Sequence, residues 1–173
     1  MLALLTLDIY GGSSSSVHQL LVSSTSRKSR GLALCAMKRP LPFLTSLNRF
    51  FWESGREGRL QFLRCQECTT WVHPPQPVCP ACLDERLAPT AVVGSGVIDS
   101  FTVNHQAWVP GLAVPFVIAR VAIDGAPGVF LTSNVVGSDI DEVSIGDPVT
   151  VEFERQDDVW FPLFRKSEVS ASG

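Results

Sequence analysis

The chain has 173 residues, 45% of them hydrophobic, and its 17 acidic residues outnumber 14 basic ones, which gives a net charge of −3. This length suits one ordinary domain or two small modules that share a core. The charge balance offers no basic surface of the kind that binds nucleic acid, and no apolar run reaches the roughly 18 residues of a membrane span. We therefore expect a soluble, cytoplasmic protein.

Residues 1–36 differ in composition from the rest of the chain. They include the serine run Ser13–Ser16, and they contain a single acid, Asp8, among three bases. Such serine-rich sequence without apolar periodicity is typical of disordered segments. We expect residues 1–36 to be a disordered tail, or an extension of the reading frame upstream of a natural start at Met37.

Residues 37–58 are predicted to form an amphipathic helical segment. Pro42 suits the first helical turn and Gly55 suits the C-terminal stop. The apolar residues repeat with the spacing of one helical face; they are Phe43, Leu44, Leu47, Phe50 and Phe51. A helix of about three turns is too short to be stable alone, so this face must be buried.

The aromatic end of that helix has two interpretations. Phe50, Phe51 and Trp52 can pack into the core of their own domain. Alternatively, they also present a hydrophobic surface to a partner protein or to an acyl chain, because interface cores are enriched in such side chains.

Two CxxC pairs dominate residues 59–88. The four cysteines, with ten residues between the two pairs, are Cys65, Cys68, Cys79 and Cys82. In each pair a tight turn directs both sulfurs into one hollow, and a short return brings the two hollows together around a tetrahedral ion. This spacing predicts one Zn²⁺ in a zinc ribbon. Four thiolates leave no ligand position for water, so the zinc is expected to be structural.

Two other chemistries are compatible with four cysteines. Iron in a rubredoxin-like electron-transfer site also takes four thiolates. Two disulfides are the second alternative, although these are typical of small secreted domains. His73 lies between the pairs and is surplus if all four thiolates bind the metal, whereas Cys35 has no partner in the pattern and is expected to be a free thiol.

Residues 89–167 read as an all-β unit, followed by a C-terminal tail at 168–173. Val149, Val151 and Phe153 alternate with polar residues, as in a half-buried strand. Five strands are predicted at Val97–Asn104, Phe116–Asp124, Val129–Val135, Val149–Glu154 and Trp160–Arg165. So many short strands in this length predict a small closed barrel. Gly94–Gly96 indicates a bulge or a tight turn before the first of them.

The order of these parts, together with four sequence segments, resembles the zinc-ribbon/OB-fold family of acyl-CoA-associated proteins over residues 38–167. The segments are Gly96–His105, Thr132–Gly137, Ile145–Glu154 and Pro162–Arg165. The resemblance implies a mainly β chain with an N-terminal amphipathic helix, a rubredoxin-like zinc ribbon and a C-terminal five-stranded OB-fold barrel. Thr69 and Leu83 stand where the family often has a glycine after each CxxC.

The resemblance also implies a function. Members of this family are accessory partners of thiolase-fold enzymes, such as thiolases, condensing enzymes and steroid side-chain aldolases, and similar domains are fused to hydratase-like subunits. We therefore expect a non-catalytic subunit in a hetero-oligomer, such as a heterotetramer, that helps to form the partner's acyl-CoA site. The family pattern places no catalytic residue on this chain.

Two residues are candidates for contact with acyl-CoA. His105 ends the first predicted barrel strand, and Trp108 follows it in the next loop. The histidine is suited to hydrogen-bond a thioester or pantetheine group, and the indole is suited to form a flat apolar wall. A loop-edge histidine without a function is the alternative. The alternative function for the whole chain is single-stranded nucleic-acid binding, which OB-fold proteins often perform through a basic groove with stacking aromatics.

Overall fold

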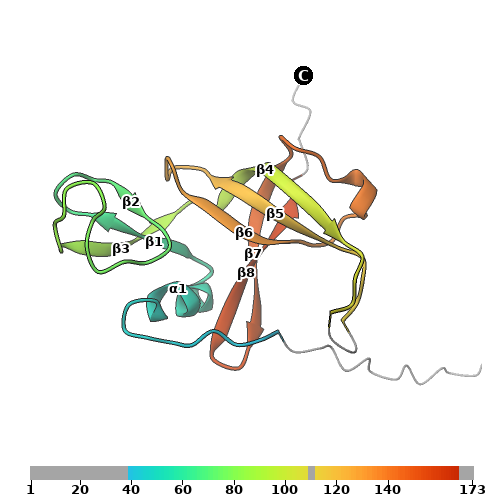
Figure 1. Cartoon of the computed structure of the whole chain (residues 1–173), viewed down its shortest axis with the longest axis horizontal. Helices are drawn as coiled ribbons and strands as arrows, with labels where there is room; N and C mark the ends of the chain where they lie inside the picture. The colour runs from blue at the N-terminus through green and yellow to red at the C-terminus, as the bar shows by residue number, and fades with distance from the viewer. Residues whose placement is uncertain (1–38, 109–111, 168–173) are drawn as a thin grey trace, which may run out of the picture. The chain divides into compact units, whose positions relative to one another are not determined.

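The structure is a computed structural model that describes residues 39–108 and 112–167, all of which belong to one compact unit (Figure 1). The two predicted tails, 1–36 and 168–173, lie outside the described residues. Two short helices come first: α1 (Arg49–Glu53) and the 3₁₀ helix η1 (Ser54–Glu57). The strands that follow are β1 (Leu60–Cys65), β2 (Trp71–Val72), β3 (Leu87–Val92), β4 (Ser95–Asn104), β5 (Phe116–Ile123), β6 (Phe130–Val135), β7 (Pro148–Gln156) and β8 (Val159–Lys166), with a 3₁₀ turn, η2 (Ile140–Glu142), before β7.

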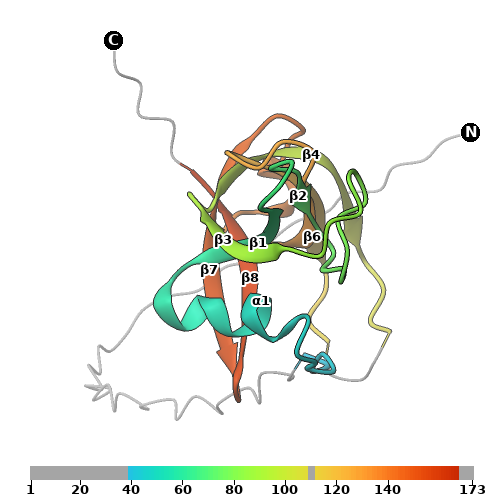
Figure 2. The ribbon, with the colours of Figure 1, turned by 90° about the vertical axis from the view of Figure 1, so that its left-hand side faces the viewer.

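The last five strands close into a barrel in the order β4-β5-β6-β8-β7 (Figures 1 and 2). The neighbouring strands are antiparallel except β6 and β8, which run parallel and pair only at Val135 and Phe164. The predicted five-stranded barrel is therefore confirmed. Among the described residues, no helix has the length and the apolar character needed to cross a membrane.

The strands follow the alternation of the sequence, with one shift of register. In β7, Val149 is buried while Thr150 is exposed, as predicted. In β4 the register shifts between Ile98 and Ser100. Ile98 is buried and Val97 is exposed before the shift, whereas Phe101 and Val103 pack against the core after it. The predicted bulge therefore lies after Ile98 and not at the glycines before it.

The glycines before β4 have a different cause. A Cβ on Gly96 would collide with the backbone of Ala122 on β5, so the close approach of these two strands requires a glycine. Gly94 has a φ of +83°, which a residue with a side chain rarely adopts. The tight entry expected before β4 is therefore a bend at Gly94.

The ribbon is a separate three-stranded sheet in the order β2-β1-β3. Strand β1 pairs with β3 along its whole length, from Leu60 opposite Val92 to Cys65 opposite Leu87. The ribbon sheet thus extends to Val92, beyond the predicted boundary at residue 88. The reason is that β3 forms its backbone hydrogen bonds with β1 and not with a barrel strand.

The N-terminal helix is much shorter than predicted. It covers only Arg49–Glu53 and does not begin at Pro42. Thr45 and Asn48 explain this, because the Thr45 N–H donates to Asn48 Oδ1 (2.8 Å) and the Asn48 N–H donates to Thr45 Oγ1 (3.3 Å). These side chains accept hydrogen bonds from backbone N–H groups just before the helix. Such local side-chain bonds favour a turn over helix in the residues before Arg49. The helix also does not stop at Gly55, because η1 continues the turn to Gly58, which has a left-handed conformation.

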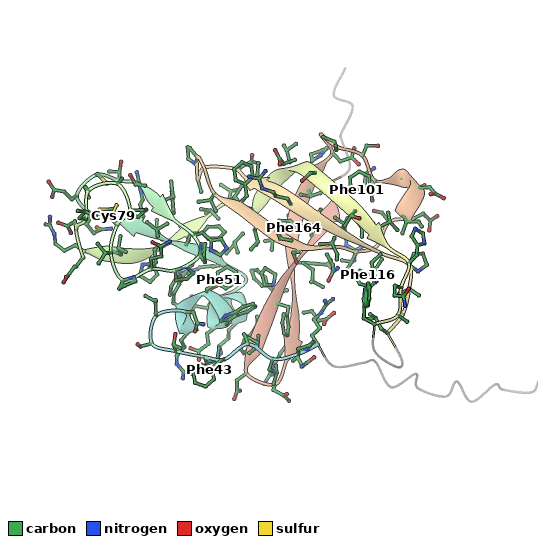
Figure 3. The ribbon with its side chains drawn as sticks, viewed as in Figure 1. Phe43, Phe51, Cys79, Phe101, Phe116 and Phe164 are labelled. Atoms are coloured by element: carbon green, nitrogen blue, oxygen red, sulfur yellow. The ribbon has the colours of Figure 1, made fainter. Side chains whose placement is uncertain are left out.

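Ribbon, helix and barrel share one hydrophobic core. Phe51 of α1 is 5% exposed, and Phe164 of β8 is fully buried in the same cluster (Figure 3). Phe62 of β1 is buried there as well. Phe51 packs against Phe62 at 6.0 Å between ring centroids, and Trp52 packs against Phe161 of β8 at 5.7 Å. The helix therefore packs against both the ribbon and the barrel.

Candidate metal centre

Each cysteine pair sits on a tight turn closed by backbone hydrogen bonds. The Thr69 N–H donates to the carbonyl of Cys65 (3.1 Å), and the Leu83 N–H donates to that of Cys79 (2.9 Å). Thr69 and Leu83 have φ values of 61° and 62°, in the left-handed region. This conformation explains why the family often has a glycine at these positions, since glycine adopts it without strain.

A second bond completes each turn in the same way. The Cys65 N–H donates to the carbonyl of Thr70, and the Cys79 N–H donates to that of Asp84, both at 2.9 Å. The two turns are therefore built alike, and each directs its sulfurs toward the other.

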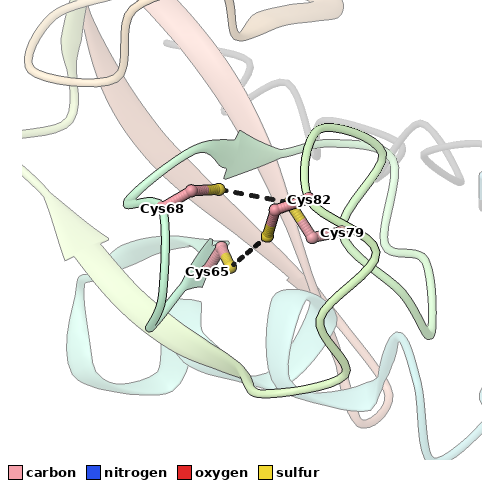
Figure 4. Close-up of side chains that lie close together, drawn as sticks. All are labelled: Cys65, Cys68, Cys79 and Cys82. Atoms are coloured by element: carbon pink, nitrogen blue, oxygen red, sulfur yellow. Dashed lines mark hydrogen bonds between the residues drawn. The ribbon is translucent and has the colours of Figure 1, made fainter.

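The four sulfurs converge on one point (Figure 4). All lie within 4.8 Å of one another, and the Sγ atoms are 3.6 Å apart between Cys65 and Cys82 and 3.5 Å apart between Cys68 and Cys79. A tetrahedral zinc with Zn–S bonds of about 2.3 Å requires sulfurs about 3.8 Å apart, whereas a disulfide bond measures about 2.05 Å. The described cysteines are free thiols, and their arrangement fits a tetrahedral ion.

Hydrogen bonds divide the protons unequally among these thiols. The Thr70 side chain and then the Thr70 backbone lower the pKa of Cys68 to about 6. At Cys82 the backbone of Asp84 lowers the pKa, but the hydrogen bond with Cys68, desolvation and the other two thiols together outweigh it and raise the pKa to about 12. A cation among the four sulfurs favours loss of these protons, because the ligating form of cysteine is the thiolate.

An arginine that sequence reasoning missed links the two turns. Arg86 Nη2 lies 2.6 Å from a carboxylate oxygen of Glu67 in the first turn and 2.8 Å from one of Asp84 after the second. The hydrogen bonds from Arg86 also lower the pKa of Asp84. Acidic residues within or just after both CxxC turns, followed by a single arginine, were the signal available in the sequence.

His73 is not part of the centre. Its ring lies against Phe51 and Phe62, at 5.3 and 4.9 Å between ring centroids. Its Nδ1 is buried and has no hydrogen-bond partner among the residues that the structure describes, and burial lowers the pKa of His73. This neutral histidine belongs to the packing between α1 and the ribbon.

Two family models and a solved structure match this arrangement. The models are the ChsH2 rubredoxin-like zinc ribbon domain, over residues 52–88, and the ChsH2 C-terminal OB-fold domain, over residues 90–154. A chain of the structure named Ltp2-ChsH2(DUF35) aldolase is 31% identical, with a TM-score of 0.67, and the match covers 73% of this chain and 98% of that one. The chain belongs to the ChsH2 (DUF35) family. The predicted resemblance and the predicted zinc ribbon domain are thereby confirmed.

Two curated proteins share part of their length with this ChsH2-family chain. The probable enoyl-CoA hydratase alpha subunit of Thermomonospora curvata is 34% identical over 128 residues, which are 73% of this chain and 40% of that protein. The 3-oxo-4,17-pregnadiene-20-carboxyl-CoA hydratase alpha subunit of Mycobacterium tuberculosis is 35% identical over 107 residues, which are 60% of this chain and 32% of that protein. The chain thus spans well under half of either relative.

A DUF35-family structure from Sulfolobus solfataricus, of unknown function, shares the fold alone. It is 16% identical with a TM-score of 0.52, and the match covers 70% of this chain and 86% of that one.

The two candidate ligand residues of this ChsH2-family chain both lie after β4, which ends at Asn104. His105 is exposed, and Trp108 is 74% exposed with its Nε1 donating to Asn104 Oδ1 at 2.9 Å. Neither residue lines either of the two hollows described in the structure. Their contact with acyl-CoA stays a prediction.

The three candidate interface residues are placed differently from one another. Phe51 is buried in the core, so in this fold its side chain is not available to a partner. Phe50 and Trp52 are partly buried against the same core. The exposed apolar side chains of this segment precede the helix: Phe43 is 86% exposed and Leu41 50% exposed.

Sequence reasoning also missed a contact that attaches the N-terminal segment to the barrel. Arg39 Nε lies 2.9 Å from Glu154, and its Nη1 donates to Asn134 Oδ1 at 2.7 Å. The backbone N–H and carbonyl of Arg39 both bond the side-chain amide of Gln156 at 2.7 Å. Beside this contact a hollow of about 360 Å³ lies between α1, β6 and β8, with Trp52 and other apolar side chains in its wall.

Proposed function

We propose that the chain is a non-catalytic accessory subunit that binds a thiolase-fold enzyme and helps to form its acyl-CoA site. The observation that carries this proposal is the match to 98% of a chain in the Ltp2-ChsH2(DUF35) aldolase structure. The names of both curated relatives describe alpha subunits of CoA-thioester hydratases, and one names a steroid-derived substrate. These names support a role in acyl-CoA metabolism, including steroid side-chain degradation, within a hetero-oligomer such as a heterotetramer.

In this proposal the zinc ion has a structural role. Cys65, Cys68, Cys79 and Cys82 hold one Zn²⁺, whose four bonds join the two turns into one unit. Zinc with four sulfur ligands has no open position for a substrate. The ion therefore supplies rigidity to the ribbon and no chemistry to the reaction. Zinc analysis by mass spectrometry of the purified chain tests this, and iron in place of zinc contradicts it.

The docking surface in this proposal lies on the segment before α1. Phe43, Leu41 and Leu47 are exposed there, and apolar side chains of this size are characteristic of protein interfaces when they cluster on a surface. The partner subunit is the occupant we propose, with Phe50 and Trp52 at the edge of the contact. His105 and Trp108 line the acyl-CoA channel that the two subunits share.

The same experiment tests both the complex and the reaction. The chain is mixed with a thiolase-fold aldolase of the Ltp2 type, and retro-aldol turnover of a steroid side-chain acyl-CoA is measured for the mixture and for each protein alone. We expect a co-eluting complex and turnover only in the mixture. Turnover by this chain alone contradicts the accessory role, and independent elution of the two proteins contradicts the choice of partner.

Variants at Phe43 and at Leu83 locate the contact. Phe43→Ala is expected to weaken the complex by about 1–4 kcal/mol if Phe43 is a hot spot, without a change in circular dichroism. The control is Leu83→Ala, which removes a similarly exposed side chain from the ribbon. If the Phe43→Ala and Leu83→Ala variants bind the partner enzyme with equal affinity, the interface does not include Phe43.

The charges of the described surface do not favour the nucleic-acid alternative. Most described cations contact a carboxylate. The others, Arg56, Arg64 and Arg155, lie over the rings of Trp160 and Trp71. Salt-sensitive binding to a single-stranded oligonucleotide, without any effect on an acyl-CoA enzyme, is the outcome that favours this alternative.

A further inference from the structure

Each close pair of sulfurs in the four-cysteine site joins the two turns and combines an exposed residue with a buried one. Cys68 is exposed and lies 3.5 Å from the buried Cys79. Cys82 is exposed and lies 3.6 Å from the buried Cys65. An oxidant from solvent therefore reaches one sulfur of each pair first, and a second sulfur already lies next to it.

We propose that the four-cysteine site is a target of hydrogen peroxide, which links Cys68 to Cys79 and Cys65 to Cys82 and releases the metal. The exposed thiolate attacks the peroxide, so that an S–O bond forms, the O–O bond breaks and hydroxide leaves. The buried thiolate then attacks the sulfenic sulfur, so that an S–S bond forms and the S–O bond breaks with loss of water or hydroxide. Two electrons pass from each pair of sulfurs to one peroxide, and two peroxides are consumed per chain.

The pairing decides what happens to the ribbon. Disulfides between the turns replace the connection that the metal made, because each joins the first turn to the second. Disulfides within each CxxC leave the two turns unconnected. The oxidised ribbon therefore keeps its sheet, and reduction with added metal restores the starting state. This inference goes beyond the accessory role and does not depend on it.

The experiment uses the full zinc-loaded chain with Cys35→Ser, which removes the fifth cysteine. Zinc release is followed with a chromogenic chelator during titration with peroxide. The oxidised chain is then cut with one protease after Glu67 and with another after Trp71, which separates Cys65, Cys68 and the Cys79–Cys82 pair into three peptides. Fragmentation spectra identify which cysteine of the last peptide carries each partner.

We expect complete zinc release after two equivalents of peroxide, with both of the first two peptides linked to the third, Cys68 to Cys79 and Cys65 to Cys82. We also expect the circular dichroism spectrum to be retained, and zinc binding to return to the starting level after a reductant and zinc are added. A link between the first two peptides, irreversible oxidation at Cys68 or Cys82, or zinc retained under excess peroxide would each overturn the proposal.

Discussion

The ribbon and the barrel are stabilised by different means although they share one core. The barrel closes five strands of six to ten residues on a set of fully buried side chains such as Ile98 and Phe164. The ribbon has three strands, one of only two residues. Outside the cluster that it shares with the barrel, its buried side chains are Leu63, Val72, Cys65 and Cys79. Its large buried side chains, Leu60 and Phe62, face the helix and the barrel.

This difference has a consequence for stability. A small sheet of this kind buries too little apolar surface to offset its conformational entropy, so it depends on the metal and on its neighbours. The barrel depends on its own packing. Perturbations of the metal, of the shared core and of the barrel surface should therefore affect the two regions unequally.

The largest expected effect is that of removing the metal. We expect chelation or Cys79→Ser to abolish amide hydrogen-exchange protection in β1–β3 and to leave most protection in β4–β8. Structural zinc contributes about 10–16 kcal/mol to the folding of small zinc domains, far more than any single side chain. Exchange measured by mass spectrometry checks this. The control is Cys35→Ser, which should keep both zinc and protection, and a ribbon that stays protected without metal contradicts the proposed dependence.

The second effect is that of truncating the shared core. Phe51→Ala is expected to lower the free energy of unfolding by about 3–5 kcal/mol, because the ring is buried where helix, ribbon and barrel meet. Urea unfolding measures the change. Phe50→Ala on the same helix should cost clearly less, because Phe50 is only partly buried. Equal costs at Phe50 and Phe51 would show that the buried position of Phe51 is wrong.

A smaller effect is expected where η1 meets the barrel. A Cβ on Gly55 would collide with the ring of Phe153 and with Trp160 on the β7–β8 hairpin. We expect Gly55→Ala to lower the free energy of unfolding by about 1–3 kcal/mol, as overpacking does. Glu57→Ala, at the exposed end of the same turn, should change it by no more than about 0.5 kcal/mol. A stabilised Gly55→Ala chain would contradict this close contact.

The smallest effect concerns pH. Burial lowers the pKa of His73 in the folded chain below its unfolded value of about 6.5, so the unfolded chain binds the proton more readily. This contribution to stability is complete above about pH 6.5 and is lost as the pH falls toward the folded pKa. His73→Phe is expected to remove that loss.

Urea unfolding of wild type and His73→Phe at pH 7.5 and 5.5 measures the effect. Metal release and carboxylate protonation also lower stability in acid, but they act on both chains. The quantity to compare is therefore the difference in free energy of unfolding between wild type and His73→Phe at each pH. An equal loss of stability in both proteins means that His73 does not contribute to the pH dependence.

The elements predicted best from the sequence are those that depend on near neighbours in the chain. The five barrel strands lie where alternation placed them, because a pleated strand turns successive side chains to opposite faces. The four cysteines converge as their spacing predicted, because a CxxC turn directs both sulfurs to one side.

Other features were decided only by the tertiary structure. Periodicity showed that Phe43 and Phe51 were able to share a helical face, but only the fold determines whether a core is present to bury each. Phe51 meets Phe62 and is buried, whereas Thr45 and Asn48 hold the chain before the helix and leave Phe43 in solvent.

The same division applies across the ribbon and the barrel. The sequence by itself determined the barrel strands and the metal-binding turns, because hydrogen bonding within a turn and alternation along a strand are local. The pairing of β3 with β1, the shift of register at Ile98 and the burial of His73 join residues that are distant in sequence. Such contacts depend on which surfaces meet, and that is settled only when the chain closes on its core.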